Sequence, residues 1–542
     1  MFYSILFPTP EDEVLSGNHP WLTFRADDSR CDRYTVRGNK IVLVSERLRQ
    51  ETPMRPGLYI DLNLVRIMDE ILCHDTDDVL SDVFYHFCPD ADMVLYRQEV
   101  MKALEDKQTG DAFRTFLASM AKAERLLQYG RGLHHPAQRD KYTVDGAALY
   151  CTSIRQVLFQ TSGLQIQSRG LLGFLDMVRA YMNEPRFLQL EMQALGARNA
   201  LEQISYGLRI NEGLLFVDYE AEKTDCVKDI RRDFDAFARW GVEAEVSRLE
   251  ILPFRQAELS PLEGLVMKAL SEKYPKAFRD THKAAESAHT LPEPFIGRFL
   301  MEIRFYFLYL DLMAKLRGKG FPFAYPEIAG EGGIEIRGAY DLALAIGTDA
   351  VVPNDFIVTG AEKGVIITGA NQGGKTTYAR SIGQIAVLAA LGLPVPCGSA
   401  RLPLYSACFS QFTQAEDASV DNGKLKEELF RLRPILKSAG TKTLVILNEL
   451  FSSATAQDAM DMAELAVGEL LESGAHVVFV THIGGLHIRN AVSMVAQVIK
   501  TSGQRLYRII RAEADGQAYA FEIAQRQKMT YSQIKERIAH GI

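Results

Sequence analysis

The sequence contains no closely spaced cysteine pairs, no basic leader and no long apolar run free of charge. Its seven cysteines are scattered over 542 residues, which argues against a zinc site or a disulfide framework and is typical of a reducing compartment. The most apolar helical stretch, about Phe295 to Leu316, is interrupted by Arg298 and Asp311, so it cannot span a bilayer. We therefore predict a cytoplasmic protein with no membrane segment.

An excess of positive charge is also missing, because 69 acidic residues outnumber 61 basic ones and the net charge is −8. The overall field does not favour nucleic acid, so any such contact must come from local basic patches. One segment, KDIRRDFDAFARW, carries Lys228, Arg231, Arg232 and Arg239, with aspartates interleaved. We favour a solvated charged face over a nucleic-acid site for this segment.

The length predicts three or four domains, at about 150 residues each. Apolar residues recur at helical spacing over about 58–127, 146–201 and 261–317. Two strand-like runs within 204–219, joined by Asn211-Glu212-Gly213, predict a hairpin. Residues 1–55 hold only short strand-like pieces, at Tyr3–Ile5 and Ile41–Val44, and disclose no role.

Residues 130–141, GRGLHHPAQRDK, are rich in helix breakers and predict a loop. The His134-His135 pair in this loop has no third candidate ligand nearby. We therefore interpret the pair as an exposed loop feature and not as a metal site.

The strongest motif lies in GVIITGANQGGKTTYAR, between Gly364 and Arg380, where a strand-like run precedes a glycine-rich loop and a helical pattern. Gly369, Gly374, Lys375 and Thr376 fit the phosphate-loop pattern G-x-x-x-x-G-K-[ST]. Glycines let backbone N–H groups surround an anion, and the helix N-terminus adds partial positive charge. Lys375 would reach the β- and γ-phosphates, and the Thr376 hydroxyl would bind Mg²⁺. The flanking strand and helix favour this interpretation over a glycine-rich turn with a solvated lysine.

Two further apolar runs end in polar residues that suit a nucleotide hydrolase. Residues 443–447 (TLVIL) precede Asn448-Glu449, and residues 475–480 (AHVVFV) precede Thr481-His482. Such continuous apolar runs are typical of central parallel strands. Glu449 is placed to polarise the attacking water, and His482 to contact the γ-phosphate. Alone, His482 would more often be structural, but its alignment with the other two motifs favours a functional role.

These motifs resemble a known family. TGANQGGKTTYAR resembles the TG-x-N-x-GGKST-Y-x-R loop of the MutS family of DNA mismatch-repair and recombination ATPases. VPND before it, and NELFSSATAQDA and VTHIGGL after it, are similar to that family's further motifs in the same order, over about Ile334 to Lys500. DADMVLYRQEVMKALED looks like the stretch that opens the family's core and lever region, and QAYAFEIAQRQKMTYSQIKERI is similar to its terminal helix-turn-helix.

The resemblance implies a multidomain chain whose parts we expect in a fixed order. A segment of unclear role at 1–55 precedes a helical core and lever at 56–330, with a small β-containing clamp inserted at about 203–255. An α/β P-loop, ABC-like ATPase domain follows at 331–510, and a helix-turn-helix dimerisation tail at 511–542. The stretch before the helical core has no room for the family's mismatch-binding and connector domains, so we expect a truncated form. No nuclease-like domain is expected after the ATPase.

The resemblance also implies a set of site residues. Nucleotide contacts are expected from Gly369, Asn371, Gly373, Gly374, Lys375, Thr376 and Thr377, and contacts to the nucleotide of a second subunit from Ser452, Ser453 and Thr455. Lys375, Glu449 and His482 are the expected catalytic residues, and Thr376, Asn448 and Glu449 the expected Mg²⁺ site. Asn448 replaces the family's usual aspartate, which removes a charge that helps hold hydrated Mg²⁺ and predicts slow turnover. Val351 stands where the family has an aromatic residue that stacks on adenine.

Two functional hypotheses follow. The first is an ATPase that uses ATP and Mg²⁺, binds double-stranded or branched DNA as a homodimeric clamp, and acts in DNA repair or recombination. The second is a scaffold that dimerises around ATP with weak or no hydrolysis and engages protein or DNA structures. Lys375, Thr376, Glu449 and His482 favour the first, whereas Asn448 and the acidic net charge support the second.

Overall fold

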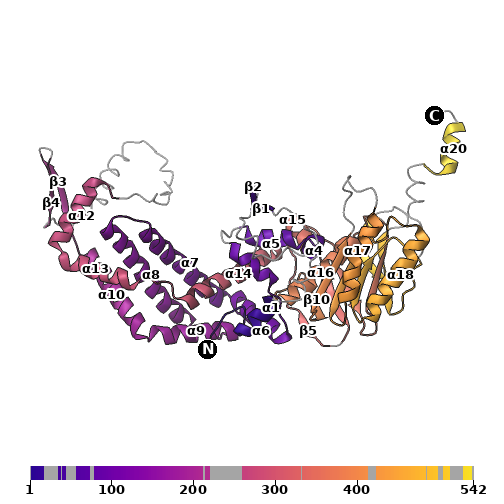
Figure 1. Ribbon diagram of the computed structural model, residues 1–542, viewed down its shortest axis with the longest axis horizontal. Coiled ribbons are helices and arrows are strands. Elements are labelled where there is room, and N and C mark those ends of the chain that lie inside the picture. The colour runs from indigo at the N-terminus through magenta and orange to yellow at the C-terminus, as the bar shows by residue number, and fades with distance from the viewer. Residues whose placement is uncertain are drawn as a thin grey trace, which may run out of the picture. The chain divides into compact units, whose positions relative to one another are not determined.

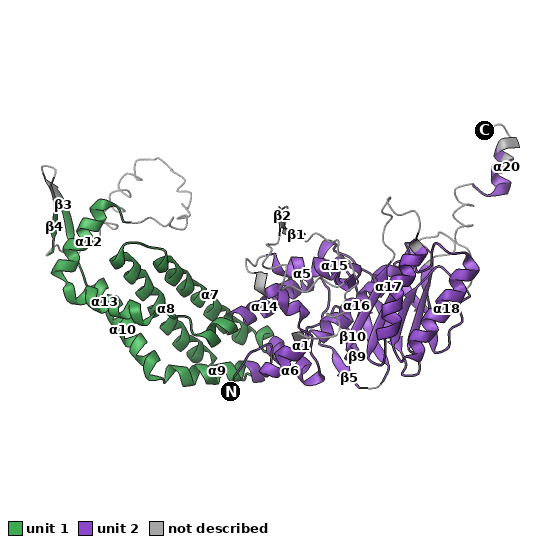
Figure 2. Ribbon diagram, in the orientation of Figure 1, with its two compact units in different colours: residues 1–2, 103–167, 171–300 green, residues 3–102, 168–170, 301–542 purple. Residues whose placement is uncertain are grey.

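A computed structural model describes most of the chain, which divides into two compact units (Figures 1 and 2). Unit 1 comprises residues 1–2, 103–167 and 171–300, and unit 2 comprises 3–102, 168–170 and 301–542. The described residues are 2–17, 34–37, 40–43, 57–73, 78–211, 214–219, 259–330, 332–370, 372–412, 423–483, 485–498, 505–512 and 529–539. The basic segment around Arg231 and the loop residue Asn371 lie outside these ranges.

Unit 1 is a helical bundle that carries a small hairpin (Figure 2). The longest of its helices, α7 (Lys107–Arg131) and α8 (Pro136–Thr161), pack along each other. Small side chains, Val144 on α8, Ala197 on α10 and Ala284 on α13, form a buried cluster where those helices meet. The other elements are α9 (Arg169–Met182), α10 (Pro185–Glu202), α12 (Pro261–Lys273), α13 (Pro275–Ser287) and the antiparallel strands β3 (Gly207–Asn211) and β4 (Leu214–Asp218).

The predicted hairpin is therefore confirmed, whereas the predicted loop at 130–141 is too long. α8 already begins at Pro136, because proline is pre-organised for the first turn of a helix and its missing N–H needs no partner there. His134 and His135 lie in the short connection that remains. Within the described ranges, no group of three metal-ligating side chains occurs.

The N-terminal segment of unit 2 is buried without forming the strand expected at Tyr3–Ile5. Side chains from two helices, α6 (Ala91–Glu105) and α14 (Pro294–Arg317), bind its backbone instead of a neighbouring strand. The Tyr96 hydroxyl donates to the Ser4 carbonyl at 2.6 Å, and the Ile5 N–H donates to the Glu302 carboxylate at 2.8 Å. Buried backbone N–H and C=O groups need hydrogen-bond partners. These side chains supply partners for the segment, so it needs no neighbouring β-strand.

Further elements of unit 2 precede its sheets. They are α1 (Pro10–Gly17), β1 (Tyr34–Arg37), β2 (Lys40–Leu43), α4 (Gly57–Asp61), α5 (Leu64–Leu72) and the 3₁₀ helix η1 (Asp78–Tyr85). β1 and β2 pair in antiparallel fashion, so a strand does form close to the expected Ile41–Val44.

A six-stranded sheet with the order β10-β11-β12-β8-β13-β14 forms the centre of unit 2 (Figure 1). Its first five strands are parallel to their neighbours, and β14 pairs with β13 in antiparallel fashion. The strands are β8 (Gly364–Gly369), β10 (Ala407–Phe412), β11 (Thr443–Asn448), β12 (His476–Val480), β13 (Ala491–Val498) and β14 (Arg505–Arg511). The predicted strands around the phosphate loop and the two later motifs are thus present as β8, β11 and β12.

Helices flank this sheet, and one of them also contacts a second sheet. The helices are α16 (Lys375–Ala390), α17 (Lys424–Ser438) and α18 (Ala456–Glu472). α16 contacts β11 and β12 and also β6 of the second sheet, which explains why α16 is buried along most of its length. The second sheet has the order β5-β9-β6-β7, from β5 (Glu327–Ala329), β9 (Ser399–Pro403), β6 (Ile334–Ala339) and β7 (Asn354–Val358), with α15 (Leu342–Gly347) after β6.

The predicted helical and α/β content agrees with the structure. At the end of the chain, α20 (Tyr531–Ala539) is described, but 513–528 are not, so the helix-turn-helix remains a prediction. No helix in the described ranges combines the length and apolar character that a membrane span requires.

His476 at the start of β12 predicts a pH dependence of stability. Burial, reinforced by the charge of Lys363, lowers the pKa of His476 to about 4. The unfolded chain takes up this proton near pH 6.5, so between these values it binds more protons than the folded chain and the free energy of unfolding decreases as pH falls. We expect His476→Gln to gain thermal stability relative to the wild type as the pH is lowered from 7.5 to 5. Calorimetry would measure this difference, with the exposed His289→Gln as control, and a pH-independent difference would contradict the assignment.

Candidate functional site

The phosphate loop follows β8 and ends at the first residue of α16. Three of its residues have left-handed backbone angles, with φ of 118° at Gly369, 58° at Gln372 and 90° at Gly374. A Cβ atom at Gly373 would lie 2.9 Å from the Ala370 carbonyl oxygen, so a side chain has no room there. The glycines at 369, 373 and 374 are therefore required by the tight curvature of this loop.

Lys375 folds back over the loop that precedes it. Its Nζ donates to the carbonyl oxygens of Gly369 at 2.9 Å and Ala370 at 3.2 Å. Burial lowers the pKa of Lys375, and the charge of Glu449 opposes this shift. A buried ammonium held only by neutral carbonyls favours an incoming anion, because an ionic hydrogen bond is stronger than a neutral one.

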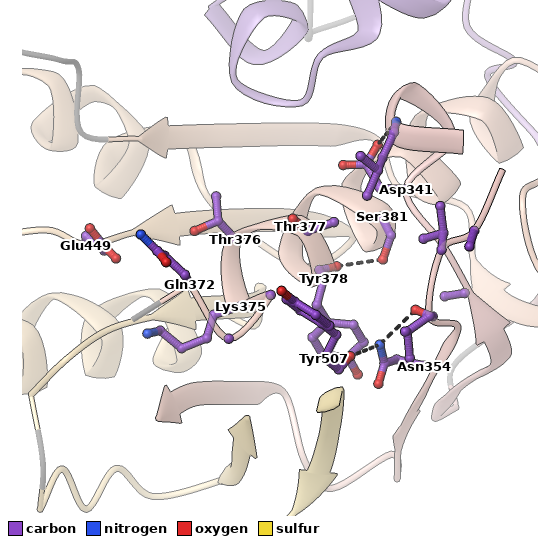
Figure 3. A pocket seen from close by; sticks show the side chains of 17 residues that line it. Asp341, Asn354, Gln372, Lys375, Thr376, Thr377, Tyr378, Ser381, Glu449 and Tyr507 are labelled. Atoms are coloured by element: carbon purple, nitrogen blue, oxygen red, sulfur yellow. Dashed lines mark hydrogen bonds between the residues drawn. The ribbon is translucent and has the colours of Figure 1, made fainter. Parts of the chain in front are cut away.

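A cavity of about 380 Å³ extends from this loop to the second sheet (Figure 3). Its phosphate-loop end is lined by Gln372, Gly373, Gly374, Lys375, Thr376, Thr377 and Glu449. The opposite end is lined by residues of the second sheet and its connections, together with β14: Ala339, Asp341, Leu344, Ala350, Val351, Val352, Asn354 and Tyr507. Tyr378 and Ser381 of α16 lie between them. This volume and the mixture of polar and apolar lining are those of a small-molecule site.

Asn448 and Thr376 are brought together at the end of β11. The Thr376 hydroxyl donates to Asn448 Oδ1 at 2.9 Å. Two neutral oxygens are a weak set of donors for a resident Mg²⁺, which prefers carboxylates. They fit an ion that enters with nucleotide phosphates, because these supply the missing negative charge.

Glu449 and His482 follow the ends of the neighbouring strands β11 and β12, and their side chains lie at ion-pair distance. His482 Nε2 lies 2.7 Å from Glu449 Oε1, and the two side chains are 42% and 38% exposed. Glu449 has a φ of 56°, and its N–H donates to the Val480 carbonyl at 2.8 Å, so the chain turns sharply where β11 ends. Two of the predicted catalytic residues are thus in contact. Glu449 lines the cavity, whereas His482 contacts Glu449 and does not line the cavity itself.

Glu428 holds the turn after Glu449 and was not found from the sequence. It lies on α17, is 7% exposed, and accepts the Phe451 N–H at 2.8 Å. Phe451 has a φ of 63°, so this carboxylate stabilises a second left-handed residue close to Glu449. Nothing in a charged helix 23 residues earlier signals such a contact.

Tyr507 is the second residue that the sequence did not disclose. It lines the cavity together with Val351, the position at which the family resemblance places an aromatic side chain. Asn354 fixes the backbone of β14 around it: its Nδ2 donates to the Tyr507 carbonyl at 3.0 Å, and its Oδ1 accepts the Ile509 N–H at 2.7 Å. A Cβ atom on Gly374 would lie 3.5 Å from the Tyr507 ring. An aromatic ring is therefore present at this cavity, although it comes from another strand.

The predicted contacts to a second subunit, Ser452, Ser453 and Thr455, lie outside this cavity. All three are exposed, and none lines the cavity. Thr455 is the N-cap of α18, where its hydroxyl accepts the Asp458 N–H and donates to the Asp458 carboxylate at 2.6 Å. A capping role is thus present for Thr455, and a contact to a second subunit stays a prediction for all three.

A parallel sheet with a phosphate loop between β8 and α16 is the arrangement of P-loop nucleotide-binding domains. Residues 365–536 match the family model described as MutS domain V. The DNA mismatch repair protein MutS of Thermosipho melanesiensis is 24% identical over 95% of this chain. The resemblance to the MutS family that the motifs predicted is therefore confirmed.

Other relatives match mainly a shorter part of the chain. The DNA mismatch repair protein MutS of Thermotoga petrophila is 28% identical over 32% of this chain, and the endonuclease MutS2 of Gemmatimonas aurantiaca 26% identical over 38%. The matched parts span 22% and 26% of those two proteins and 66% of the Thermosipho protein.

Proposed function

We propose that this protein is a MutS-like ATPase that binds double-stranded or branched DNA as a dimeric clamp and acts in DNA repair or recombination. The observation that carries the proposal is a single cavity lined by Lys375, Thr376 and Glu449, with His482 bound to Glu449. The names of the relatives, DNA mismatch repair protein and endonuclease, support a role in DNA metabolism.

ATP is the proposed substrate of this cavity. The loop N–H groups and Lys375 bind the β- and γ-phosphates, and the N-terminus of α16 adds partial positive charge. Tyr507 and Val351 offer apolar contact to the base at the other end. Mg²⁺ bound with the phosphates, beside Thr376 and Asn448, would neutralise the charge that develops during transfer.

Glu449 is the proposed general base. Its carboxylate takes a proton from the water that attacks the γ-phosphorus, the bond to the β–γ bridging oxygen breaks, and ADP and phosphate are released. His482 Nε2 holds one carboxylate oxygen at 2.7 Å, and Glu428 fixes the turn that follows through Phe451. Both residues orient the base.

The scaffold hypothesis remains the second candidate because Asn448 contributes no charge beside Thr376. A single-turnover ATPase assay with and without branched DNA separates the two. Hydrolysis that responds to the DNA supports the clamp. Binding of ATP without turnover in either condition supports the scaffold.

Removal of the Lys375 ammonium tests the nucleotide assignment. Lys375→Ala is expected to abolish ATP binding or hydrolysis, because the ammonium that faces the β- and γ-phosphates is lost. Calorimetric titration with ATP and a steady-state assay measure the two effects. The exposed Lys437→Ala is the control for a lost positive charge, and equal affinity and turnover in both variants would refute the assignment.

Removal of the Glu449 charge tests the chemistry. Glu449→Gln should bind ATP normally and lower the single-turnover rate by about 10²-fold or more, the scale of a lost general base. Glu464→Gln, an exposed change on α18, removes the same charge away from the site. A rate for Glu449→Gln within twofold of this control would assign the base to another group.

We further propose that two copies of the chain form a homodimer around ATP. Ser452 and Ser453 are exposed beside the N-terminus of α18, where backbone N–H groups favour an anion. Met529, two residues before α20, and Tyr531, its first residue, are 64% and 83% exposed, which suits an additional contact between subunits.

A mixing experiment tests whether the exposed loop acts on the partner's nucleotide. One subunit carries Lys375→Ala, and the other carries Ser452→Tyr with Ser453→Tyr, which leaves the Thr455 cap intact. The heterodimer should recover about one working site, because an intact phosphate loop then meets an intact exposed loop. ATPase activity is measured after mixing, with differently tagged subunits to confirm heterodimers. Heterodimers without recovered activity would show that the loop does not act between subunits.

A further inference from the structure

An arginine from β14 contacts the phosphate loop directly. Arg505 Nη1 donates to Gln372 Oε1 at 2.6 Å. Gln372 directly precedes Gly373 in the loop, has a φ of 58°, and lines the nucleotide cavity (Figure 3). No motif in the sequence singled out Arg505, which is 133 residues from Gln372.

Strand register explains why Arg505 reaches this loop. Gly369, the last residue of β8, pairs with Ala496 on β13. Arg505 pairs with Val498, two positions further along β13, so it lies beyond the carboxyl end of β8, where the loop begins. Tyr507, two residues later on β14, lies against Gly374 and lines the cavity. The start of β14 therefore approaches the loop at two points.

We propose that Arg505 is a phosphate-binding residue of this site, which exchanges the Gln372 side chain for a terminal phosphate oxygen of a bound nucleoside triphosphate. This inference rests on the proposed nucleotide binding. The guanidinium bond to Gln372 is made to a neutral amide, whereas a phosphate oxygen is anionic and gives a stronger, forked hydrogen bond. The exchange therefore favours the bound state.

The charge of the site gives Arg505 a particular role in this chain. Asn448 supplies a neutral oxygen beside Thr376, so the divalent cation is held less strongly than by a carboxylate. A permanently charged guanidinium at Gln372 neutralises phosphate charge without a metal. Gln372 lines the same end of the cavity as Glu449, the proposed base at the γ-phosphate, so Arg505 should favour a triphosphate over a diphosphate.

The test compares affinities of the full chain for a non-hydrolysable ATP analogue and for ADP, by calorimetric titration. Arg505→Gln is expected to lower the affinity for the analogue about 10-fold, equivalent to about 1.4 kcal/mol. The affinity for ADP is expected to fall by less than about threefold. Arg508→Gln is the matched control, because Arg508 is an exposed arginine on the same strand. It should change neither affinity. Omitting Mg²⁺ should enlarge the effect of Arg505→Gln.

Gln372→Met separates a phosphate contact from a structural one, because it removes the amide that Arg505 holds and keeps the arginine. If Arg505 binds phosphate, Gln372→Met retains affinity for the analogue. If Arg505 only stabilises the loop, Gln372→Met and Arg505→Gln lower the affinities for the analogue and for ADP by similar factors. That result overturns the proposal. Equal affinities for Arg505→Gln and Arg508→Gln also overturn it. A wild type that binds neither nucleotide would instead refute the proposed function itself.

Discussion

The alignment of parallel strand ends at one edge of the six-stranded sheet is the constraint on which the rest of the site depends. The register places Asn448, Val480 and Ile367 in one row across β11, β12 and β8. The chain leaves each strand at the same level, so the phosphate loop, Glu449 and His482 emerge together although up to 113 positions separate Gly369 from His482. Backbone hydrogen bonds between neighbouring parallel strands hold this register.

Much of this arrangement could be predicted from the sequence. The apolar runs before Gly369, Asn448 and Thr481 identify buried strands, since no alternation of polar residues interrupts them. The phosphate loop, the hairpin at 207–218 and the helical regions followed from local spacing and turn residues. These features depend on contacts within a few residues, which a sequence pattern reports directly.

The parts that could not be predicted depend on tertiary contacts. Asn354 holds the backbone of β14 at the Tyr507 carbonyl and the Ile509 N–H, where Tyr507 lines the cavity, and neither Asn354 nor Tyr507 carries a sequence signal for the other. Glu428 and Arg505 belong to charged segments whose pattern is that of solvated surfaces. The strand expected at Tyr3–Ile5 does not form because Glu302 and Tyr96 satisfy the backbone there. His482 is correctly assigned to the strand end, but its bond to Glu449 follows from the pairing of β11 with β12.

The charges at the site bear on both proposed functions, the ATP-hydrolysing clamp and the scaffold with weak or no hydrolysis. Lys375 is buried against neutral carbonyls, Asn448 adds an uncharged oxygen, and Arg505 lies on a neutral amide. Lys375 and Glu449 are the charged residues that line the phosphate-loop end of the cavity, and Arg505 adds a second positive charge beside Gln372. We propose that such a site attracts the polyanionic triphosphate strongly and binds a divalent metal weakly. Because charge neutralisation by the metal contributes to the transfer step as well as to binding, affinity for ATP and speed of hydrolysis need not rise together in this protein. Under the proposed function, these residues would favour a long-lived ATP-bound clamp, whereas an aspartate at position 448 would favour rapid turnover.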